Sequence, residues 1–268
     1  MPLFSIITIS FNSEKTIERT IQSVFAQTCK DFEYIIVDGG SKDKTLDILK
    51  KYEPLFEGRL KWKSEPDNGI YNAMNKGVSR ATGQMIGIVN SDDWLELDAL
   101  EIVSDTINNE KLDYSKPLLV TGWICYHYID GSKHVMKTNR DRYEYYAKRL
   151  RMGLNHPATF VSKATYNQIG LFDENYKLFA DADFIVRCYR ADVKAFFVDK
   201  ILSNMSDGGA SSRVTKKAYR DSLYRIDKYY PDNNINKKLK QAQVGLHYIG
   251  SYLIPYPIVK LFRKKKNK

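Results

Sequence analysis

The chain has 268 residues, which suits one large α/β domain with an appendage and is too short for two full domains, because single hydrophobic cores stop growing at about 250 to 300 residues. Hydrophobic residues make up 43% of the sequence and aromatic residues 13%, a composition that excludes an intrinsically disordered chain. The net charge of +10 arises in residues 213–268, which contain 15 Lys or Arg and 3 Asp; no DNA or RNA motif accompanies this charge, so we do not expect nucleic-acid binding.

The first part of the chain alternates between apolar strands and amphipathic helices. Each strand is a run of apolar and often β-branched residues, as in a sheet that is covered on both faces. Each helix repeats its apolar positions at helical spacing, and Asn12 or Ser13 can cap the first one. Strands are expected at residues 4–9, 34–37, 60–63 and 85–89, with helices at 17–25, 46–49 and 70–80. This order predicts an open, mostly parallel, Rossmann-like sheet with helices on both faces and ligands at the carboxyl ends of its strands.

The second half of the chain has a mixed pattern. Asp130 and Gly131 form a pair that is favoured in hairpin turns, and apolar runs flank them. From Val214 onward the sequence predicts helices that are interrupted at Pro231. The expected hairpin strands are residues 118–128 and 133–137, followed by a helix at 182–189 and a strand at 195–198.

Two adjacent acids, Asp92 and Asp93, follow directly after the strand at 85–89. Carboxylates at the carboxyl end of a strand can hold a divalent cation such as Mg²⁺, which also takes water and phosphate oxygens as ligands. The alternative is structural: Ser91, Asp92 and Asp93 would cap a helix that begins near Leu95.

A further acid, Asp38, follows the strand at 34–37 and precedes two glycines that let a ligand approach the backbone closely. A turn with a capping serine would look the same. Because both acidic strand ends belong to one sheet, however, we expect them to face one crevice. There Asp38 can accept a hydrogen bond from a base or ribose, and Asp93 can hold a cation under a diphosphate.

The segment between these acidic strand ends contains several polar groups. Asp67 or Asn68 fits a turn or a helix cap, which explains much of the segment in structural terms. The amides of Asn72 and Asn75 and the amine of Lys76 fall on one short helix. They are candidates for contacts with the phosphates or ribose of a nucleotide.

Five segments, in their order along the chain, resemble the family 2 glycosyltransferases of the GT-A fold, especially the single-domain bacterial enzymes that build surface polysaccharides. The resemblance extends over residues 3–212, and its motifs are residues 5–12, 17–27, 37–41, 65–77 and 90–95. It implies an inverting, metal-dependent enzyme that moves a sugar from a nucleotide-sugar donor to a hydroxyl of a saccharide or lipid-linked saccharide acceptor. The implied cofactor is Mn²⁺ or Mg²⁺.

The resemblance also implies roles for individual residues of the donor site. Asp93 coordinates the metal, and Asp92 contacts the ribose or supports the metal site. The other implied donor contacts are Thr8, Ser10 and Asn12 in the nucleotide pocket, Asp38 at the base, and Asp67 and Lys76 near the nucleoside.

The catalytic base of an inverting transfer is a carboxylate beside the acceptor hydroxyl. The resemblance places it in residues 180–187, where many relatives have Glu-Asp and this chain has Ala180 followed by Asp181. We assign the base to Asp181, with Asp183 as the second candidate. Helix capping by these acids is the structural alternative.

Two later segments bear on the acceptor and on the number of sugars added. Residues 155–160 match a stretch found in this subgroup, so His156 is expected to contact the acceptor or the diphosphate, or else to be a hydrogen-bonded structural histidine. Residues 206–212 form a loop of small residues that can close over phosphates. The QxxRW pattern of processive polymerases is absent, which favours the addition of a single sugar.

Two other functions fit parts of the sequence. A nucleotidyltransferase would also place acids and a cation at strand ends, but it would release pyrophosphate and usually has a basic phosphate loop that this sequence lacks. A catalytically inactive protein that binds sugar nucleotides or polysaccharides would be favoured by loss of Asp92, Asp93 or Asp181, all of which are present. The transferase is the better interpretation.

We divide the chain into a transferase domain, residues 1–212, and a basic helical extension, residues 213–268. In the extension an aromatic and apolar stretch, 248–259, contains two prolines and is shorter than the ~20 apolar residues that a membrane-spanning helix needs. Aromatic residues beside the basic cluster at 263–268 suit an anionic membrane surface. We expect a peripheral position on the inner face of the membrane, with packing of residues 248–262 on the domain as the alternative.

The cysteines and the N-terminus favour a cytoplasmic location. Cys29, Cys125 and Cys188 are widely spaced without a CxxC pair, which excludes a disulfide framework and a zinc motif. Met1 is followed directly by an apolar strand without a basic n-region, so we expect no secretory signal.

Overall fold

The computed structural model describes residues 1–208, 215–232 and 235–253. The chain divides into two compact units. The first unit comprises Met1–Asn175 and Ala180–Gly209, and the second comprises Tyr176–Phe179 together with the chain from Ala210 onward. The sequence did not indicate that a short segment before Asp181 belongs with the C-terminal helices.

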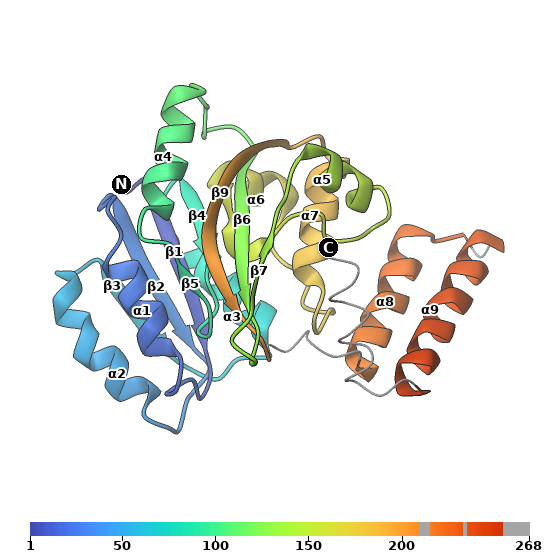
Figure 1. Ribbon diagram of the computed structural model, residues 1–268, viewed down its shortest axis with the longest axis horizontal. Helices are drawn as coiled ribbons and strands as arrows, with labels where there is room; N and C mark the ends of the chain where they lie inside the picture. The colour runs from blue at the N-terminus through green and yellow to red at the C-terminus, as the bar shows by residue number, and fades with distance from the viewer. Residues whose placement is uncertain (209–214, 233–234, 254–268) are drawn as a thin grey trace. The chain divides into compact units, whose positions relative to one another are not determined.

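The first unit is built around one mixed β-sheet (Figure 1). In the described residues the strand order is β3-β2-β1-β4-β8-β6-β9-β5, and β7 pairs with β6. The strands are β1 (Phe4–Ser10), β2 (Phe32–Asp38), β3 (Leu60–Ser64), β4 (Met85–Ile88), β5 (Trp94–Leu95), β6 (Leu118–His127), β7 (Lys133–Met136), β8 (Thr159–Ser162) and β9 (Lys194–Ser206). Paired strands among β1 to β4 are parallel, as are β6 and β9, whereas β4 with β8, β6 with β7 and β8, and β5 with β9 are antiparallel.

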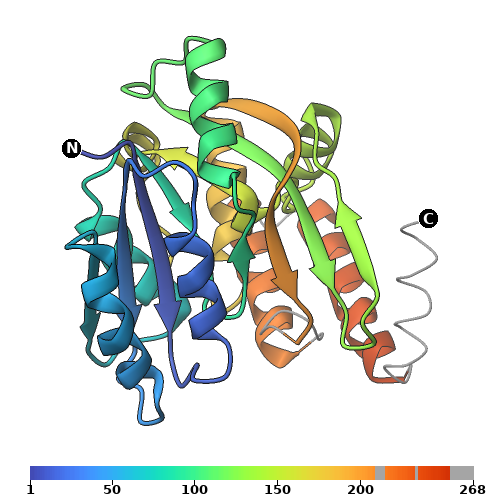
Figure 2. The ribbon, with the colours of Figure 1, turned by 60° about the vertical axis from the view of Figure 1, so that its left-hand side comes forward.

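Helices cover both faces of this sheet (Figure 1, Figure 2). The apolar sides of α1, α2 and α4 join Phe4, Tyr34 and Phe160 in the hydrophobic core. On the opposite face α3 approaches β1 so closely that a Cβ added to Gly77 would lie 2.5 Å from Ile7 Cγ2, so this position needs glycine. The helices are α1 (Ile17–Phe25), α2 (Thr45–Tyr52), α3 (Ile70–Arg80), α4 (Ala99–Asn109), α5 (Arg140–Ala147), α6 (Lys163–Ile169) and α7 (Ala180–Arg190), with short 3₁₀ turns η1 (Glu53–Phe56) and η2 (His156–Ala158).

The predicted architecture is confirmed. The chain forms a GT-A-like α/β fold whose strands β1 to β4 arise from the continuous apolar runs of the sequence, and the helix predicted at 70–80 is α3. The strand predicted at 195–198 is part of a longer one, because β9 has 13 residues. Cys29, Cys125 and Cys188 are free thiols.

The expected cap of the first helix is wrong. Helix α1 begins after Thr16, and no side chain caps it. Asn12 instead adopts a φ of 50°, a left-handed conformation that asparagine tolerates better than most residues. Its side chain is thereby turned to the loop that follows β2, where it accepts a hydrogen bond from Lys42 N.

The helix expected near Leu95 begins later, at Ala99. Trp94 and Leu95 instead form β5, because they pair with the end of β9. Residues 91–93 therefore do not cap α4, and the structural alternative for the acid pair is wrong. This correction leaves Asp92 and Asp93 in a short connection between two strands.

The second unit contains α8 (Lys216–Tyr229) and α9 (Ile235–Leu253), which pack against each other. Within it Asp221 is 2% exposed and accepts hydrogen bonds at 2.6–3.1 Å from the backbone amides of Lys177, Leu178 and Phe179. These contacts attach the segment before α7 to α8. In the described part of the chain no helix is long and apolar enough to cross a membrane. The basic cluster at 263–268 lies outside the described residues.

Candidate active site

The carboxyl ends of several strands meet at one edge of the sheet. Because β1, β2 and β4 are parallel, Ser10 pairs with Asp38 at this edge, and Asp92 and Asp93 follow β4 there. The end of β9 joins them, since its antiparallel pairing with β5 sets it beside Trp94. The acidic strand ends therefore lie at one edge of the sheet, as expected from the sequence.

Asp38 is fully buried, and donors from the protein surround its carboxylate. Ser10 Oγ and Ser41 Oγ donate to Oδ1 at 2.9 and 2.5 Å. Ser64 Oγ and the amides of Gly40 and Ser41 donate to Oδ2 at 2.6–3.0 Å. Burial raises the pKa of Asp38, but these hydrogen bonds outweigh burial and lower it. Asp38 thus joins the ends of β1, β2 and β3, and its contact with a nucleotide base stays a prediction.

The loops after β1, β2 and β4 are linked by further polar contacts. Asn12 N donates to Ser41 Oγ at 2.8 Å, and Asn12 Oδ1 accepts from Lys42 N at 2.9 Å. Ser13 Oγ lies 2.8 Å from Ser91 Oγ, which connects the first loop to the acid pair. The three loops therefore form one continuous rim along the sheet edge.

Asp93 is as buried as Asp38, at 1% exposure, but it has fewer donors. Ser206 N donates to Oδ1 at 3.1 Å and Asn90 Nδ2 donates to Oδ2 at 3.3 Å. Burial and then the charge of Asp92 raise the pKa of Asp93 to about 7. Burial also raises the pKa of Asp92. The acid pair thus carries negative charge that its protein neighbours compensate only in part.

Arg19 of α1 lies beside this pair. Its Nη2 donates to Asp92 O and to Ser206 Oγ, both at 2.8 Å, and its guanidinium carbon lies 3.6 Å from the ring centroid of Trp94. Ser206 Oγ in turn donates to Asp92 O at 2.9 Å. The charge of Arg19 favours the ionised form of both acids, although less strongly than burial opposes it. Arg19 therefore fixes the backbone of the acid pair against the end of β9.

The donor groups around the acid pair suit Mn²⁺ or Mg²⁺. Among the described residues Asn90 Oδ1 is buried and has no hydrogen-bond partner, although Nδ2 of the same amide contacts Asp93. A buried amide oxygen without a partner is costly, and ligation of a hard cation would satisfy it. The described residues contain no group of three or more His, Cys, Asp or Glu that could hold a metal ion. Further ligands would thus be water and phosphate oxygens, which Mg²⁺ prefers.

Thr8, Ser10 and Asn12, all predicted to line the nucleotide pocket, differ in their exposure to solvent. Thr8 is fully buried, and its Oγ1 accepts a hydrogen bond from Tyr34 Oη at 2.9 Å. A contact between Thr8 and a nucleotide would need this part of β1 to open. Ser10 is 6% exposed and donates to Asp38, whereas Asn12 is exposed on the rim.

Asp67 lies against the loop that follows β2. A Cβ added to Gly39 would be 2.6 Å from Asp67 Oδ2, so a larger residue at this position would displace the Asp67 carboxylate. Asp67 Oδ1 accepts from Gly69 N at 2.8 Å, as expected for an acid in the turn before a helix. The structure therefore brings Asp67 to the same edge as Asp38.

The other polar groups of α3 contact protein segments. Lys76 Nζ donates to Pro66 O at 3.0 Å. Asn72 Nδ2 and Asn75 Nδ2 donate to the carboxylate of Glu174 at 3.0 and 2.9 Å. These groups hold α3 to the segments before it and after α6, and their contacts with phosphates or ribose stay predictions.

Asp181 lies half-buried in the first turn of α7. Tyr71 Oη and Ala182 N donate to its Oδ1 at 3.2 and 2.8 Å. Within the described residues no donor is bonded to Oδ2. Burial and then the charge of Asp181 raise the pKa of Tyr71, so the phenol stays a donor. Because Tyr71 lies in the first turn of α3, after the carboxyl end of β3, Asp181 belongs to the same edge of the sheet.

His156 lies in η2 with its ring 6.0 Å from that of Phe172. Burial lowers the pKa of His156, and the charge of Asp181 opposes this effect. A neutral imidazole near Asp181 can donate a hydrogen bond to a hydroxyl group or accept one from it, and the carboxylate of Asp181 stays ionised. The predicted contact of His156 with acceptor or diphosphate stays a prediction.

Asp183 has a different environment from Asp181 although it lies in the same turn. It is fully buried and forms an ion pair with Arg187 at 2.9 Å. Arg187 also donates to Ile169 O and Leu171 O at 2.5 and 2.7 Å. This pair attaches α7 to the end of α6, so the geometry favours Asp181 over Asp183 as the base.

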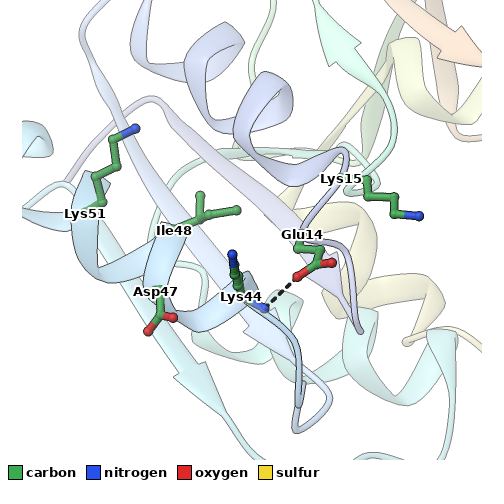
Figure 3. A pocket seen from close by; sticks show the side chains of 6 residues that line it. All are labelled: Glu14, Lys15, Lys44, Asp47, Ile48 and Lys51. Atoms are coloured by element: carbon green, nitrogen blue, oxygen red, sulfur yellow. Dashed lines mark hydrogen bonds between the residues drawn. The ribbon is translucent and has the colours of Figure 1, made fainter.

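An open pocket of about 370 Å³ lies between the loop before α1 and helix α2 (Figure 3). In Figure 3 the carboxylate of Glu14 accepts a hydrogen bond from Lys44 N, at 3.0 Å. The lining residues are Glu14, Lys15, Lys44, Asp47, Ile48 and Lys51. None of the predicted site residues lines this pocket, and we do not assign it to the donor.

The sequence did not single out three residues that shape the site: Arg19, Tyr71 and Ser206. Arg19 and Tyr71 lie in the motifs 17–27 and 65–77, but the resemblance assigned a role to neither of them. Tyr71 has the pattern of an ordinary buried aromatic residue. Ser206 falls at the start of the loop that was expected to close over phosphates. For the neighbouring ion pair a signal existed, because Asp183 and Arg187 have the i, i+4 spacing of a helical ion pair.

Comparison with known sequences identifies relatives of the chain. Residues 5–163 match the family described as Glycosyl transferase family 2. A PGL/p-HBAD biosynthesis glycosyltransferase of Mycobacterium bovis is 32% identical over 229 residues, which cover 83% of this chain and 84% of that protein. A chondroitin synthase of Escherichia coli is 30% identical over 210 residues, which cover 65% of this chain and 30% of that protein.

Solved structures share the fold. The S. aureus TarS 1–349 complex with UDP-GlcNAc has a TM-score of 0.64 at 20% identity, covering 90% of this chain and 71% of that one. The mannosyltransferase PcManGT of Pyrobaculum calidifontis, in complex with GDP-Man and Mn²⁺, has a TM-score of 0.63 at 13% identity, covering 99% of this chain and 79% of that one. The sequence match together with this fold shows that the chain belongs to glycosyltransferase family 2 and is a nucleotide-sugar glycosyltransferase.

Proposed function

We propose that the chain is an inverting, cation-dependent transferase that adds a single sugar to a hydroxyl of a saccharide or lipid-linked saccharide. The observation that carries this proposal is the presence of two incompletely satisfied carboxylates, Asp93 and Asp181, at one edge of the sheet. Each has a counterpart that the protein itself satisfies: Asp38 at the end of β2 for Asp93, and Asp183 in the same helical turn for Asp181. Asp93 fits the donor side of the reaction and Asp181 the acceptor side.

On the donor side Asp93, Asp92 and Asn90 Oδ1 would hold Mn²⁺ or Mg²⁺. A divalent cation bound there neutralises the negative charge that develops on the departing nucleoside diphosphate. The amide of Ser206 orients Asp93, and Arg19 holds the backbone of Asp92. The mannosyltransferase PcManGT was solved with Mn²⁺, which supports this choice of cation.

On the acceptor side Asp181 Oδ2 takes the proton of the acceptor hydroxyl while the hydroxyl oxygen attacks the anomeric carbon. The bond from that carbon to the diphosphate breaks on the opposite side, so the configuration at the carbon is inverted. Tyr71 keeps Asp181 Oδ1 engaged and thereby orients Oδ2. A positioned carboxylate of this kind typically contributes about 10²-fold to 10⁴-fold to the rate.

We place the nucleoside along the rim formed by the loops after β1 and β2. Asn12 is exposed there, and Asp67 lies next to Gly39. Asp38 and Ser10 would act mainly by holding this rim, since their polar atoms are engaged with each other. Lys76 and His156 complete the proposed set near the nucleoside and the acceptor.

The acceptor is proposed to be a saccharide or glycolipid of the bacterial cell surface. The name of the mycobacterial relative refers to PGL/p-HBAD biosynthesis, and the Escherichia coli relative is a chondroitin synthase. Both names point to glycan chains or glycolipids as products. The S. aureus TarS complex contains UDP-GlcNAc, which makes UDP sugars the first donors to test.

The test is a screen of UDP and GDP sugars with and without Mn²⁺, in which release of the nucleoside diphosphate is measured. We expect slow, Mn²⁺-dependent hydrolysis of one donor, and faster release once a suitable acceptor is added. NMR of the product should show the inverted anomeric configuration. Release of pyrophosphate would instead identify a nucleotidyltransferase, and tight binding without any turnover would identify an inactive binding protein.

A further inference from the structure

Helix α9 carries a stripe of exposed apolar side chains. Ile235, Leu239, Leu246 and Ile249 are 73%, 62%, 71% and 58% exposed. Their spacing of four, seven and three residues places them on one side of the helix, with Ala242 between them. We call these residues the α9 stripe. Four large apolar side chains in a row on one exposed helix face mark an interaction surface.

The opposite side of α9 is occupied by α8. The rings of Tyr248 and Tyr219 stack with centroids 4.6 Å apart. Lys237 Nζ and Gln241 Nε2 contact Asp227 Oδ1 at 3.0 and 3.1 Å. Helical spacing puts these three positions on the side of α9 opposite the stripe. Packing against α8 therefore holds α9 in place and leaves the stripe uncovered by α8.

The charge of the C-terminal sequence limits the choice of partner. From residue 233 to the end of the chain the sequence contains nine Lys or Arg and no Asp or Glu. Within α9, Lys238 is exposed beside the stripe, whereas Lys240 Nζ lies 5.1 Å from the ring centroid of Tyr230. A second copy of this chain would bring like charges together, which opposes association. An anionic lipid surface offers an apolar phase for the stripe and negative charge for the lysines.

We propose that the α9 stripe docks on an anionic bilayer surface, with its four apolar side chains in the interface and Lys238 at the level of the lipid phosphates. The helix would lie in the plane of the membrane, as amphipathic helices of this kind do. This inference does not depend on the proposed transfer reaction, because it rests on exposure and charge within the C-terminal unit. It assigns membrane contact to α9 itself, whereas contact through the basic cluster at 263–268 stays a prediction.

The experiment is flotation of the full chain with vesicles of phosphatidylcholine and phosphatidylglycerol, compared with phosphatidylcholine alone. The double variant Leu239→Gln, Leu246→Gln is expected to lower the partition onto anionic vesicles by about 10-fold or more, since two apolar side chains leave the interface. The matched control, Leu239→Met with Leu246→Met, should keep it. Lys238→Gln should weaken binding to anionic vesicles only, and high salt should remove that difference.

Separate measurements distinguish the stripe from other causes. A variant with Lys264, Lys265 and Lys266 changed to Gln should still show the loss caused by the leucine substitutions. The inference is overturned if the wild-type chain does not float, or if the glutamine variant floats as well as the methionine control. A dimer in sedimentation that the glutamine variant abolishes would assign the stripe to a second copy. A lower Tm of that variant without vesicles would show that protein covers the stripe, which also overturns the proposal.

Discussion

Asp38 ends β2 and Asp93 follows β4, the two strands that flank β1, and both acids are buried, yet their electrostatic environments are opposite. Asp38 accepts five hydrogen bonds from the protein, and its pKa is lowered. Asp93 accepts two, and its pKa is raised to about 7. The number of donors supplied by the protein, rather than burial or position on the sheet, separates an acid that maintains the fold from one that is available to a ligand.

The same contrast recurs within the first turn of α7. Asp183 is fully buried and paired with Arg187, whereas Asp181 is half-buried and engaged only through Oδ1. Both pairs therefore contain one satisfied and one incompletely satisfied acid. The predictions below test whether this distinction separates structural from functional carboxylates.

The largest effect is expected for Asp181→Asn. The amide cannot take a proton from the acceptor, so kcat should fall by about 10²-fold to 10⁴-fold while the affinity for the donor nucleotide changes little. Steady-state kinetics and nucleotide titration measure the two quantities. The matched variant, Asp183→Asn, should lower the free energy of unfolding by about 3 kcal/mol because it breaks a buried ion pair, with a smaller change in kcat. An active Asp181→Asn beside a folded but inactive Asp183→Asn would reverse the assignment of the base.

The next effect concerns the donor side. Asp93→Asn should weaken Mn²⁺-dependent binding of UDP or GDP by about 100-fold, because a neutral amide replaces a charged ligand. Calorimetric titration with and without Mn²⁺ measures it. The control is Asp98→Asn, an exposed acid just before α4 whose side chain caps nothing. If the Asp93 variant and the control bind UDP or GDP with equal Mn²⁺-dependent affinity, Asp93 is not a ligand of the cation.

A moderate effect on stability is expected for Asp38→Asn. The amide places donor hydrogens where the protein already supplies donors, so the free energy of unfolding should fall by about 2 to 3 kcal/mol. Urea denaturation gives this quantity. Ser64→Ala removes one of the donors and should cost about 1 kcal/mol. If Asp38→Asn instead abolished nucleotide binding at full stability, Asp38 would be a ligand-binding acid like Asp93.

A smaller effect is expected from pH. The pKa of Asp38 is lower in the folded chain than its ordinary value of 3.8, so the unfolded chain binds more protons in this range. The stabilisation due to Asp38 is therefore present above about pH 4 and is lost as the pH falls through the folded pKa. Unfolding free energies of the wild type and Asp38→Asn should converge as the solution is made more acidic. A difference that stays constant down to the acid transition would contradict this origin of the stabilisation.

The smallest effect is expected for Arg19→Met. It removes two hydrogen bonds and a cation–π contact, and because the site is exposed the loss of stability should be about 1 kcal/mol. The affinity for UDP or GDP with Mn²⁺ should fall only a few-fold, since Asp92 would keep its carboxylate and lose part of its backbone support. Lys15→Met removes an exposed charge before the same helix and serves as the control. Equal effects of both substitutions would show that Arg19 acts through charge alone.

The fold and the strand-end acids were predictable because their signals are local. Continuous apolar runs define β1, β2 and β4, and an acid after such a run must lie at the carboxyl edge of a parallel sheet. The helix start expected near Leu95 failed because pairing with β9, far along the chain, overrides the local preference. A two-residue strand leaves no periodic pattern in a sequence.

The state of each acid was not predictable, because its donors come from distant segments. Asp38 receives a hydrogen bond from Ser64, and Asp181 receives one from Tyr71, 110 residues away. Similar sequence surroundings therefore produced one saturated and one incompletely satisfied carboxylate in each pair. The ion pair of Asp183 is the exception, because its partner Arg187 lies one helical turn away.

The contact between Ser206 and Asp93 has a consequence for how the enzyme matures. The two residues are 113 positions apart, and β5 forms only by pairing with the end of β9. Contacts over such separations form late, because the entropy of closing the intervening chain must first be offset. Strands β1 to β4 can thus assemble on a growing chain while Asp93 still lacks its amide donor. Donor-binding competence should appear only once β9 has been synthesised and docked, and fragments that end before β9 should fold in part without acquiring it.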